Sequence, residues 1–325
     1  MDVKKMSPRS ISGETRSKNV SASSIFHGLK RERCPSGTVP IRRITRENLV
    51  NAKYFAKKVD QIHANGFPNL GFRFVSAEEI IRGKRYFGGA ASMSLHNLTV
   101  DPDQFSTSQI WIVNSPTTDQ MNAIEFGIMK NPSVVGGNLP RLFGYWIVRN
   151  GHRITGCYNM ACEGFIQTHP TIYIDQPFLY SSIYGHISYD VHIMVYRAQD
   201  HWWLRMGGTA ERSENVGYWP NVIFTTLRTN ASAVRYGGYV GSMSEASTPP
   251  MGNGFLPQIQ NFNTTAYMRL MKYVNEEGAS VDLNSHSVLT NNGRVPQCYN
   301  IMFAGQIGGE WNNTIAYGGP GGYCK

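Results

Sequence analysis

Short runs of β-branched and aromatic residues, broken by Gly, Pro and Asn, fill the chain from Tyr86 to its end. In several runs apolar and polar positions alternate, which is the period of a strand with one buried face. Asn150-Gly151 between two runs is typical of a hairpin turn. Helical periodicity is almost absent, with residues 221–227 as one short candidate. The pattern predicts an all-β domain, an antiparallel β-sandwich, with strands at 109–113, 123–129, 142–148, 187–196, 202–206, 233–243, 267–274 and 298–304.

The first 85 residues have a different pattern. Residues 1–33 are rich in Ser, Lys and Arg without periodicity, which predicts a disordered basic leader. Thr45 is a suitable N-cap for a basic helix that extends to about residue 59, and residues 60–85 are polar and glycine-dotted. We therefore expect a basic leader at 1–33, a partly helical pro-segment with a mobile linker at 34–85, and a β domain at 86–325. Limited proteolysis is expected to trim the chain near residues 60–90.

The net charge of +9 belongs to the leader and the pro-segment. Residues 1–85 carry 18 Lys and Arg against 7 Asp and Glu, whereas residues 86–325 carry 13 against 15. A basic arm can bind nucleic acid or a membrane surface. This one lacks a dense Lys/Arg block and has few aromatics, and no apolar run has the length of a membrane span. We therefore expect neither a nucleic acid nor a membrane as partner, and we expect a monomer.

Five cysteines are compatible with free thiols, a partial zinc set or disulfides. The Cys157/Cys162 pair has no second pair at zinc-finger spacing, so we favour two local bridges, Cys157–Cys162 and Cys298–Cys324. Disulfides predict an exported glycoprotein, although the first ten residues lack an apolar secretory core. We therefore expect the precursor to begin upstream of Met1. N-glycosylation sequons lie at Asn97, Asn230, Asn263 and Asn312.

Metal and cofactor chemistry is not indicated. The nine histidines are scattered, and the chain has no H-E-x-x-H helix motif, nucleophile elbow or phosphate-binding loop. We expect no cofactor and no metal site.

Strand alternation suggests one groove. It places Ile124, Phe126 and Ile128 on a core face and Glu125 on the opposite face. Tyr239 points away from the core in the same way, so both side chains project into one groove if their strands share a sheet. A lone outward Glu is otherwise an ordinary solvated charge. The further groove candidates, three of them glycines that would let a bound chain approach the backbone, are Gln109, Gly127, Gly237 and Gly238.

Several short motifs follow one another along the chain. They are Gln109-Ile-Trp-Ile112, Asn122-Ala-Ile-Glu-Phe-Gly127, Arg141-Leu-Phe-Gly-Tyr-Trp146, Gly156-Cys-Tyr-Asn159 with Cys162, Trp202-Trp203-Leu204, Gly217-Tyr-Trp-Pro220, Gly237-Gly-Tyr-Val240, Met251-Gly-Asn-Gly254 and Tyr317-Gly-Gly-Pro-Gly-Gly322. In this order they resemble the plant neprosin family. Cys34-Pro-x-Gly-Thr-x-Pro-Ile-Arg-Arg43 is similar to the end of that family's activation-peptide region, and the resemblance covers nearly all of the chain from Cys34 onward.

The resemblance implies a secreted zymogen with an antiparallel β-sandwich, whose active relatives are glutamic peptidases that cut at proline without a metal. Two glutamates face each other across a groove in that family. Glu125 matches the first, but Tyr239 stands where the family motif has the second, and Ile128 stands where the family typically has Trp. Two close carboxylates can share a proton, so that one acts as acid and the other activates water. A phenol cannot replace a carboxylate base.

Two functions remain open at this point. The first is a glutamic prolyl endopeptidase that binds an extended peptide, such as a proline-rich one, and that is weak or inactive because its dyad is incomplete. The second is a non-catalytic protein that binds a peptide or a cell-wall glycan through exposed aromatic rings. Glu245 is the nearest acidic residue along the chain that could replace the missing carboxylate, but six residues of extended strand separate it from Tyr239.

Overall fold

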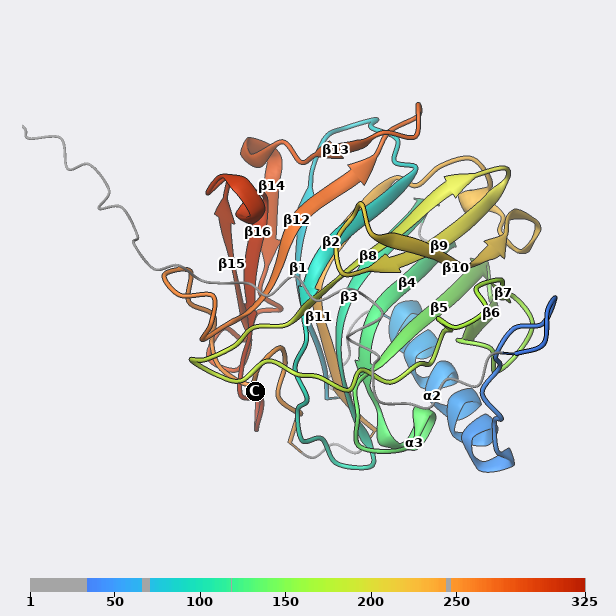
Figure 1. Cartoon of the computed structure of the whole chain (residues 1–325), viewed down its shortest axis with the longest axis horizontal. Coiled ribbons are helices and arrows are strands. Elements are labelled where there is room, and N and C mark those ends of the chain that lie inside the picture. Colours follow the sequence, from blue (N-terminus) through green and yellow to red (C-terminus); the bar gives the residue numbers. More distant parts are fainter. Residues whose placement is uncertain (1–33, 66–70, 118, 244–246, 325) are drawn as a thin grey trace, which may run out of the picture.

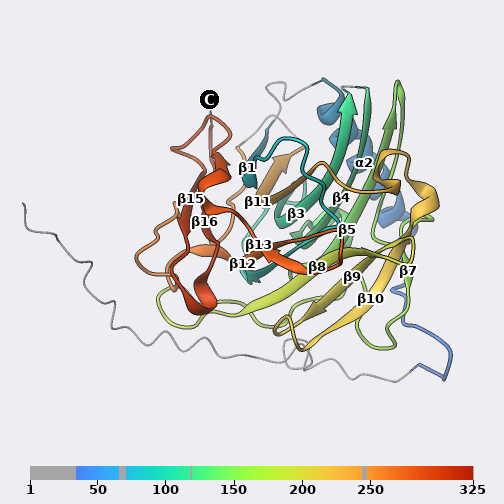
Figure 2. The ribbon, with the colours of Figure 1, turned by 90° about the horizontal axis from the view of Figure 1, so that it is seen from above.

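The computed structural model describes residues 34–65, 71–117, 119–243 and 247–324 (Figure 1). The predicted leader at 1–33 and Glu245 lie outside the described residues. Two antiparallel sheets pack face to face and carry most of the regular structure, which confirms the predicted sandwich. Figure 2 shows the two sheets as separate layers, with helix α2 as a third layer beside the seven-stranded sheet.

The seven-stranded sheet has the order β14-β1-β11-β3-β4-β5-β6. All its pairings are antiparallel, and β5 and β6 are joined by the predicted hairpin turn at Asn150-Gly151. Its strands are β1 (Phe72–Glu79), β3 (Gln104–Thr117), β4 (Gln120–Lys130), β5 (Arg141–Asn150), β6 (Arg153–Tyr158), β11 (Ala233–Ser242) and β14 (Val288–Asn291).

The nine-stranded sheet has the order β15-β16-β12-β2-β8-β9-β10-β7, and β13 pairs with β12 off this path. Its strands are β2 (Gly88–Ser94), β7 (Ile166–Gln167), β8 (Asp190–Ala198), β9 (His201–Gly207), β10 (Ser213–Pro220), β12 (Ala266–Val274), β13 (Ser280–Asp282), β15 (Asn300–Gly305) and β16 (Thr314–Gly318). Short 3-10 turns connect some of the strands, namely η1 (Asn221–Ile223), η2 (Thr226–Arg228), η3 (Ser285–Ser287) and η4 (Gly309–Trp311).

The main core lies between the two sheets. Alternation along β4 places Ile124, Phe126 and Ile128 in this core, where they meet apolar residues of the opposite sheet such as Ile193 and Leu204. The side chains at the intervening positions of β4 leave this core and face the other side of the sheet. The alternation that the sequence predicted for this strand is therefore confirmed.

A second apolar cluster covers the other face of the seven-stranded sheet. Helix α2 (Arg46–Asn65) and the short helix α3 (Pro132–Val135) lie over it, and α2 contributes Ala52 and Phe55. Thr45 caps α2 as expected, because its Oγ1 accepts a hydrogen bond of 3.1 Å from the backbone N–H of Asn48. Helix α2 thus packs onto the sheet through one apolar face.

Residues 60–85 differ from the mobile linker that the sequence suggested. Strand β1, residues Phe72–Glu79, lies inside this stretch and pairs with β11 on one side and β14 on the other. Val75 and Ala77 are fully buried. The alternation of Phe72, Phe74 and Ser76 with Val75 and Ala77 marks this strand, but the two Glu residues at its end and the Arg and Lys residues that follow it hide the pattern. The seven-stranded sheet therefore begins at Phe72, ahead of residue 86.

Both predicted disulfides are present. Cys157 bonds to Cys162 and Cys298 bonds to Cys324, each with an S–S distance of 2.08 Å, and Cys34 is unbridged. The first bridge closes the loop after β6, and the second ties the end of the chain to the segment before β15.

Candidate functional site

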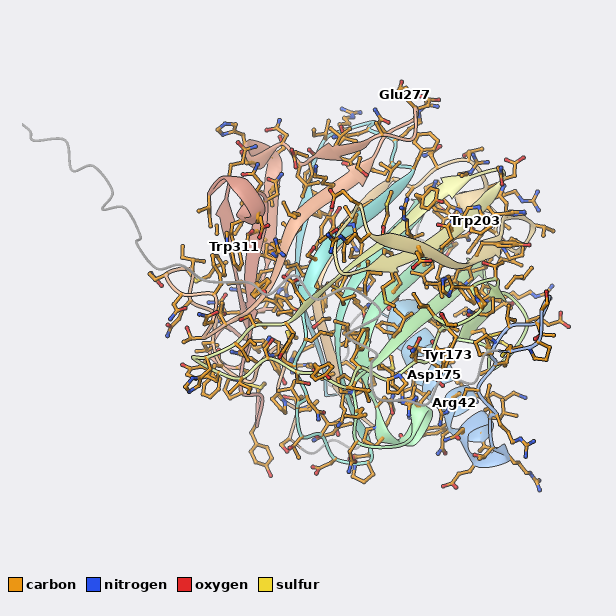
Figure 3. The ribbon with its side chains drawn as sticks, viewed as in Figure 1. Arg42, Tyr173, Asp175, Trp203, Glu277 and Trp311 are labelled. Atoms are coloured by element: carbon orange, nitrogen blue, oxygen red, sulfur yellow. A yellow bond between two sulfur atoms is a disulfide. The ribbon has the colours of Figure 1, made fainter. Side chains whose placement is uncertain are left out.

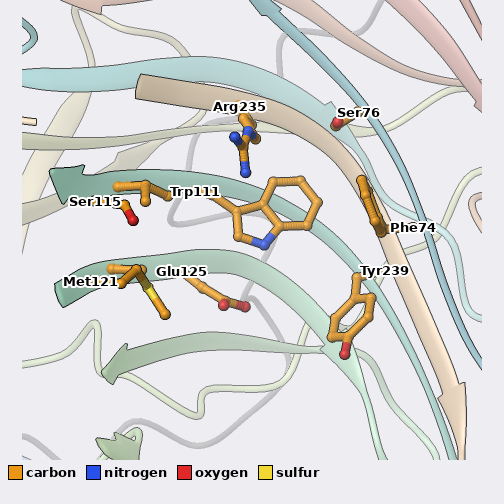
Figure 4. Close-up of a pocket in the computed structure, with 10 residues that line it drawn as sticks. Phe74, Ser76, Trp111, Ser115, Met121, Glu125, Arg235 and Tyr239 are labelled. Carbon is orange, nitrogen blue, oxygen red and sulfur yellow. The ribbon is translucent and has the colours of Figure 1, made fainter. Parts of the chain in front are cut away.

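A pocket of about 270 Å³ opens on the face of the seven-stranded sheet that carries the second apolar cluster (Figure 4). Strands β1, β3, β4 and β11 supply its walls, and Glu125 is the one acidic residue among the lining residues that the structure describes. The lining residues are Phe74, Ser76, Trp111, Val113, Ser115, Met121, Ala123, Glu125, Arg235 and Tyr239.

Strand register explains why these residues meet. Trp111 of β3 lies opposite Glu125 of β4 and opposite Arg235 of β11, so the three side chains form one row on the same face. Tyr239 lies on the same face of β11, four residues beyond Arg235, and is paired with Thr107. Alternation and sheet order together bring Glu125 and Tyr239 into one pocket, as the sequence pattern suggested.

Glu125 is buried in the floor of the pocket, with 2% of its surface exposed. The side chain of Gln109 donates a hydrogen bond of 2.7 Å from Nε2 to Oε2 of Glu125. The amide is oriented by Thr107, whose Oγ1 donates to Gln109 Oε1 at 2.6 Å. Because the Thr107 hydroxyl is hydrogen-bonded to the amide oxygen of Gln109, the amide nitrogen faces the carboxylate of Glu125. The network holds Glu125 as an acceptor in a fixed position.

Tyr239 is a buried, neutral phenol at one end of the pocket. Its side chain is 5% exposed, and its hydroxyl has no hydrogen-bond partner among the described residues. Burial raises the pKa of Tyr239 well above its usual value, and the charge of Glu125 raises it further. Tyr239 is therefore protonated at neutral and acidic pH, and the phenol can donate a hydrogen bond but cannot accept a proton as a base.

Comparison with known proteins decides the family. The family model of neprosin matches residues 102–320, well over half of the chain. This chain belongs to the neprosin family. Among solved structures, it is similar to SCP-B, a member of the eqolisin family of peptidases that was determined in a complex with the tripeptide Ala-Ile-His. That match has 7% sequence identity and a TM-score of 0.35, and it covers 76% of this chain and 97% of the other.

Helix α2 lies near the Tyr239 end of this neprosin-family pocket. Phe55 of α2 packs edge-on against Phe105 at 4.8 Å between ring centroids, and Phe105 packs against Tyr239 at 5.1 Å. Phe55 also contacts Tyr158 at 5.0 Å. Tyr158 in turn stacks on Tyr145, the residue opposite Glu125 on β5. The helix is therefore in contact with Phe105 and Tyr158, the ring neighbours of Tyr239 and Tyr145.

An ion pair attaches the chain ahead of α2 to the body. Arg42 donates from its guanidinium to Asp175 Oδ2 at 2.5 Å, and Arg141 donates to the backbone carbonyl of Asp175 at 2.7 Å (Figure 3). Burial raises the pKa of Asp175, while the hydrogen bond and charge of Arg42 lower it. The charge and the hydrogen bond of Arg42 thus offset part of the cost of burying the carboxylate of Asp175.

The glycine candidates have a packing role instead of the groove role that we expected. A Cβ at Gly127 would lie 2.1 Å from the carbonyl oxygen of Ser108, and one at Gly237 would lie 1.9 Å from that of Val75. Both glycines thus allow a neighbouring strand to come close, and neither lines the pocket. Gly238 faces Met251 and Tyr317 on the core side. Gln109 reaches the site through its bond to Glu125 and is not itself a lining residue.

Ile128 does not belong to the groove face either. It is 5% exposed and lies in the core between the sheets. Ile128 therefore contributes to core packing and adds no group to the pocket.

Several pocket residues were not singled out from the sequence. Trp111 and Arg235 lie in the same row as Glu125, and Arg235 forms an ion pair with Glu78, its neighbour on β1. Trp111 alternates with the buried Ile110 and Ile112, so its place on the groove face follows from the same pattern that gave Glu125. Phe74 and Ser76 could not be found in this way, because β1 was not recognised as a strand.

The remaining sequence candidates lie away from the pocket. The sequon residue Asn97 is exposed, and Asn230, Asn263 and Asn312 are partly exposed. Within residues 34–324, apart from the gaps named above, no three His, Cys, Asp or Glu side chains are grouped so that they could hold a metal ion. None of the helices in this part of the chain is long and apolar enough to cross a membrane.

Proposed function

We propose that this neprosin-family protein binds an extended peptide in the Glu125 pocket and hydrolyses it weakly or not at all. The observation that carries the proposal is the pairing of chemical groups in the pocket, where the carboxylate of Glu125 shares the site with the neutral phenol of Tyr239. The described lining holds no second carboxylate.

The expected low activity follows from the presence of a phenol in place of a second carboxylic acid. Glutamic peptidase catalysis needs one carboxylate to take a proton from water and a second acid to protonate the leaving amine. Glu125 can accept the proton, and Gln109 holds it in place. Tyr239 keeps its proton too tightly to complete the cycle, because its pKa lies well above 10. Loss of one general acid or base lowers the rate by about 10²–10⁴-fold.

The pocket walls suit the side chains of a peptide. Phe74, Trp111 and Met121 provide apolar surface, while Glu125 and Arg235 provide a charge of each sign. A mixed lining of this kind binds apolar side chains and orients the polar backbone between them. A proline ring is one such apolar group, and it comes with a chain that is already extended.

The pro-segment would control access to this site. Phe55 of α2 packs on the aromatic residues beside Tyr239 and Tyr145, so an incoming peptide would meet the helix at that end. We propose that the protein is exported as a precursor and that removal of α2 opens the groove. The two disulfides and the partly exposed sequon residues support export.

The test compares three forms of the full chain with a protease site inserted between α2 and β1, each cleaved before assay. Wild type, Tyr239→Glu and the double variant Tyr239→Glu/Glu125→Gln are incubated with a proline-rich peptide at about pH 3–5. We expect background cleavage by wild type, at least hundredfold faster cleavage by Tyr239→Glu, and background cleavage by the double variant. Tyr239→Gln is the matched control that changes shape without adding an acid.

Two outcomes would overturn the proposal. Rapid cleavage by wild type that persists in Glu125→Gln would remove Glu125 from the mechanism. Absence of peptide binding by cleaved wild type, measured as a change in fluorescence anisotropy of a labelled proline-rich peptide, would remove the peptide as the occupant of the pocket.

A further inference from the structure

A row of aromatic side chains crosses the outer face of the nine-stranded sheet, on the side of the molecule away from the Glu125 pocket. Tyr196 of β8 lies opposite Trp203 of β9, and Trp203 lies opposite Tyr218 of β10. Ile166 of β7 continues the row as the partner of Tyr218. The intervening residues, such as Trp202, Leu204 and Trp219, point into the core. The four side chains thus follow one line across four adjacent strands, about 14 Å long at the usual strand spacing.

The rings of this row, which we call the aromatic strip, are accessible to solvent. Tyr196, Trp203 and Tyr218 are each partly exposed, and Ile166 is 43% exposed. Trp203 is labelled in Figure 3 on the β9–β10 side of the molecule. Partly exposed aromatic rings in one continuous line are a common feature of binding surfaces, because isolated proteins rarely leave such surface open.

The rings are also held in fixed positions. The indole N–H of Trp203 donates to the carbonyl of Ala198 at 3.2 Å, and the hydroxyl of Tyr196 donates to Asn215 Oδ1 at 3.0 Å. Tyr218 lies between His201, stacked at 4.4 Å and 18°, and Trp203 at 4.7 Å. A ligand that stacks on rings already fixed in place loses less entropy on binding.

The strip carries no net charge. Residues 194–220, which contain most of it, hold three Arg and three acidic residues. Arg197 pairs with Asp200 at 2.7 Å, and Glu214 lies 3.1 Å from His169. Arg205 donates two hydrogen bonds to the carbonyl of Ser213. A surface of this kind does not attract nucleic acid or anionic lipid, which depend on unbalanced positive charge.

The shape of the strip favours a linear ligand. It is one residue wide, because the next row on one side is Arg205 with Asn215, and the next on the other side is His201 with Pro220. A globular partner needs a broader contact of about 800 Å². An extended peptide usually binds by pairing its backbone with a free strand edge, but the strip crosses strands whose backbone groups already pair with each other.

We propose that the aromatic strip binds a neutral polysaccharide with flat, β-linked sugar rings, such as a glucan. The apolar faces of the sugars would lie against the exposed surfaces of Tyr196, Trp203 and Tyr218, and their hydroxyls would reach the polar groups of Arg205 and Asn215 beside the strip. The strip is separate from the Glu125 pocket, so the protein would anchor to a glycan while the pocket remains free.

The experiment measures retention of the full chain on microcrystalline cellulose and its affinity for cellohexaose by calorimetry. Trp203→Ala and Tyr218→Ala are each expected to weaken binding about tenfold, because each removes one stacking ring. Trp203→Phe should retain most of the affinity. Tyr184→Ala removes an exposed ring that lies outside the strip and is the matched control. Glu125→Gln should bind like wild type, which separates this result from the test of the pocket.

Three outcomes would overturn the inference. The first is absence of binding by wild type to both cellulose and cellohexaose. The second is unchanged binding by Trp203→Ala and Tyr218→Ala in protein that unfolds at the same temperature as wild type. The third is preferential, salt-sensitive binding to polygalacturonate, which would assign the surface to an anionic ligand. If Trp203→Ala does not fold, Tyr218→Ala and Trp203→Phe still decide between these results.

Discussion

Gln109 donates a hydrogen bond of 2.7 Å to the buried carboxylate of Glu125. The two residues lie on adjacent strands, and Thr107 sets the orientation of the amide between them. This hydrogen bond holds the Glu125 carboxylate in one position in the pocket, and its contribution to stability can be measured without an activity assay.

Gln109→Leu is expected to lower the free energy of unfolding at pH 7 by about 2 kcal/mol, because the charged acceptor loses its donor. The same substitution in a Glu125→Gln background should cost clearly less. Urea unfolding of the two single variants and the double variant gives the coupling energy. If the two effects simply add, the hydrogen bond does not contribute to stability.

Tyr239→Phe is expected to leave the free energy of unfolding unchanged or to raise it by about 1 kcal/mol, because the hydroxyl it removes is buried without a partner. Tyr317→Phe is the matched control. Its hydroxyl donates to Ser108 Oγ at 2.6 Å, so its loss should cost about 1 kcal/mol. Thermal and urea unfolding measure both. A cost for Tyr239→Phe equal to that for Tyr317→Phe would show that the phenol has a partner in solution.

Arg42→Ala is expected to loosen the attachment of the pro-segment, because it leaves the buried carboxylate of Asp175 without its strongest partner. Limited proteolysis within residues 46–65 should become about tenfold faster, which corresponds to about 1.4 kcal/mol of local stability. Arg43→Ala changes the neighbouring exposed arginine and should leave the cleavage rate near that of wild type. Equal rates for the two variants would show that Arg42 does not hold the segment.

His192 is expected to make the protein less stable in acid. Burial lowers its pKa to about 4, from an ordinary value of 6.5; the charges of Glu211 and Asp190 oppose this shift, and those of Arg269 and Arg205 add to it. The unfolded chain takes up a proton below about pH 6.5, whereas the folded protein takes one up only near pH 4. The contribution of His192 is therefore complete above pH 6.5, and it falls by about 3 kcal/mol as the pH drops to 4.

His192→Asn should flatten this part of the pH profile. Urea unfolding at pH 7, 5.5 and 4.5 measures the effect, with His152→Asn, at an exposed turn, as the control. A profile for His192→Asn that is parallel to that of wild type would mean that other groups cause the loss of stability in acid.

Much of the fold could be predicted because side chains along β4 and β11 alternate strictly between the two faces of the sheet. Ile124, Phe126 and Ile128 alternate with Glu125, and one buried face is enough to fix which side each residue takes. The disulfides could be predicted because each pair is local in the chain. Contacts between residues far apart in the chain could rarely be predicted from the sequence. Gln109 was expected as a groove residue, but its hydrogen bond to Glu125 could not be predicted, because that bond depends on the register between β3 and β4, which no single strand shows.

The glycines show a different reason for error. A glycine in a strand indicates that something approaches the backbone closely, but the sequence does not say what. At Gly127 and Gly237 the approaching group is the adjacent strand.

Strand β1 was missed for another reason. The polar residues after Glu79 suggested a linker, and the short apolar pattern of β1 was not strong enough to indicate a strand against them. Pairing on both edges, with β11 and β14, stabilises this strand.

Strand β1 limits where the chain can be cut without loss of the pocket. Phe74 and Ser76 form part of the pocket wall, and the backbone around them is hydrogen-bonded to strands on both sides. A cut near residue 86 followed by loss of the upstream fragment would split the sheet and remove that wall. A shortened chain that keeps an intact pocket must therefore begin ahead of Phe72.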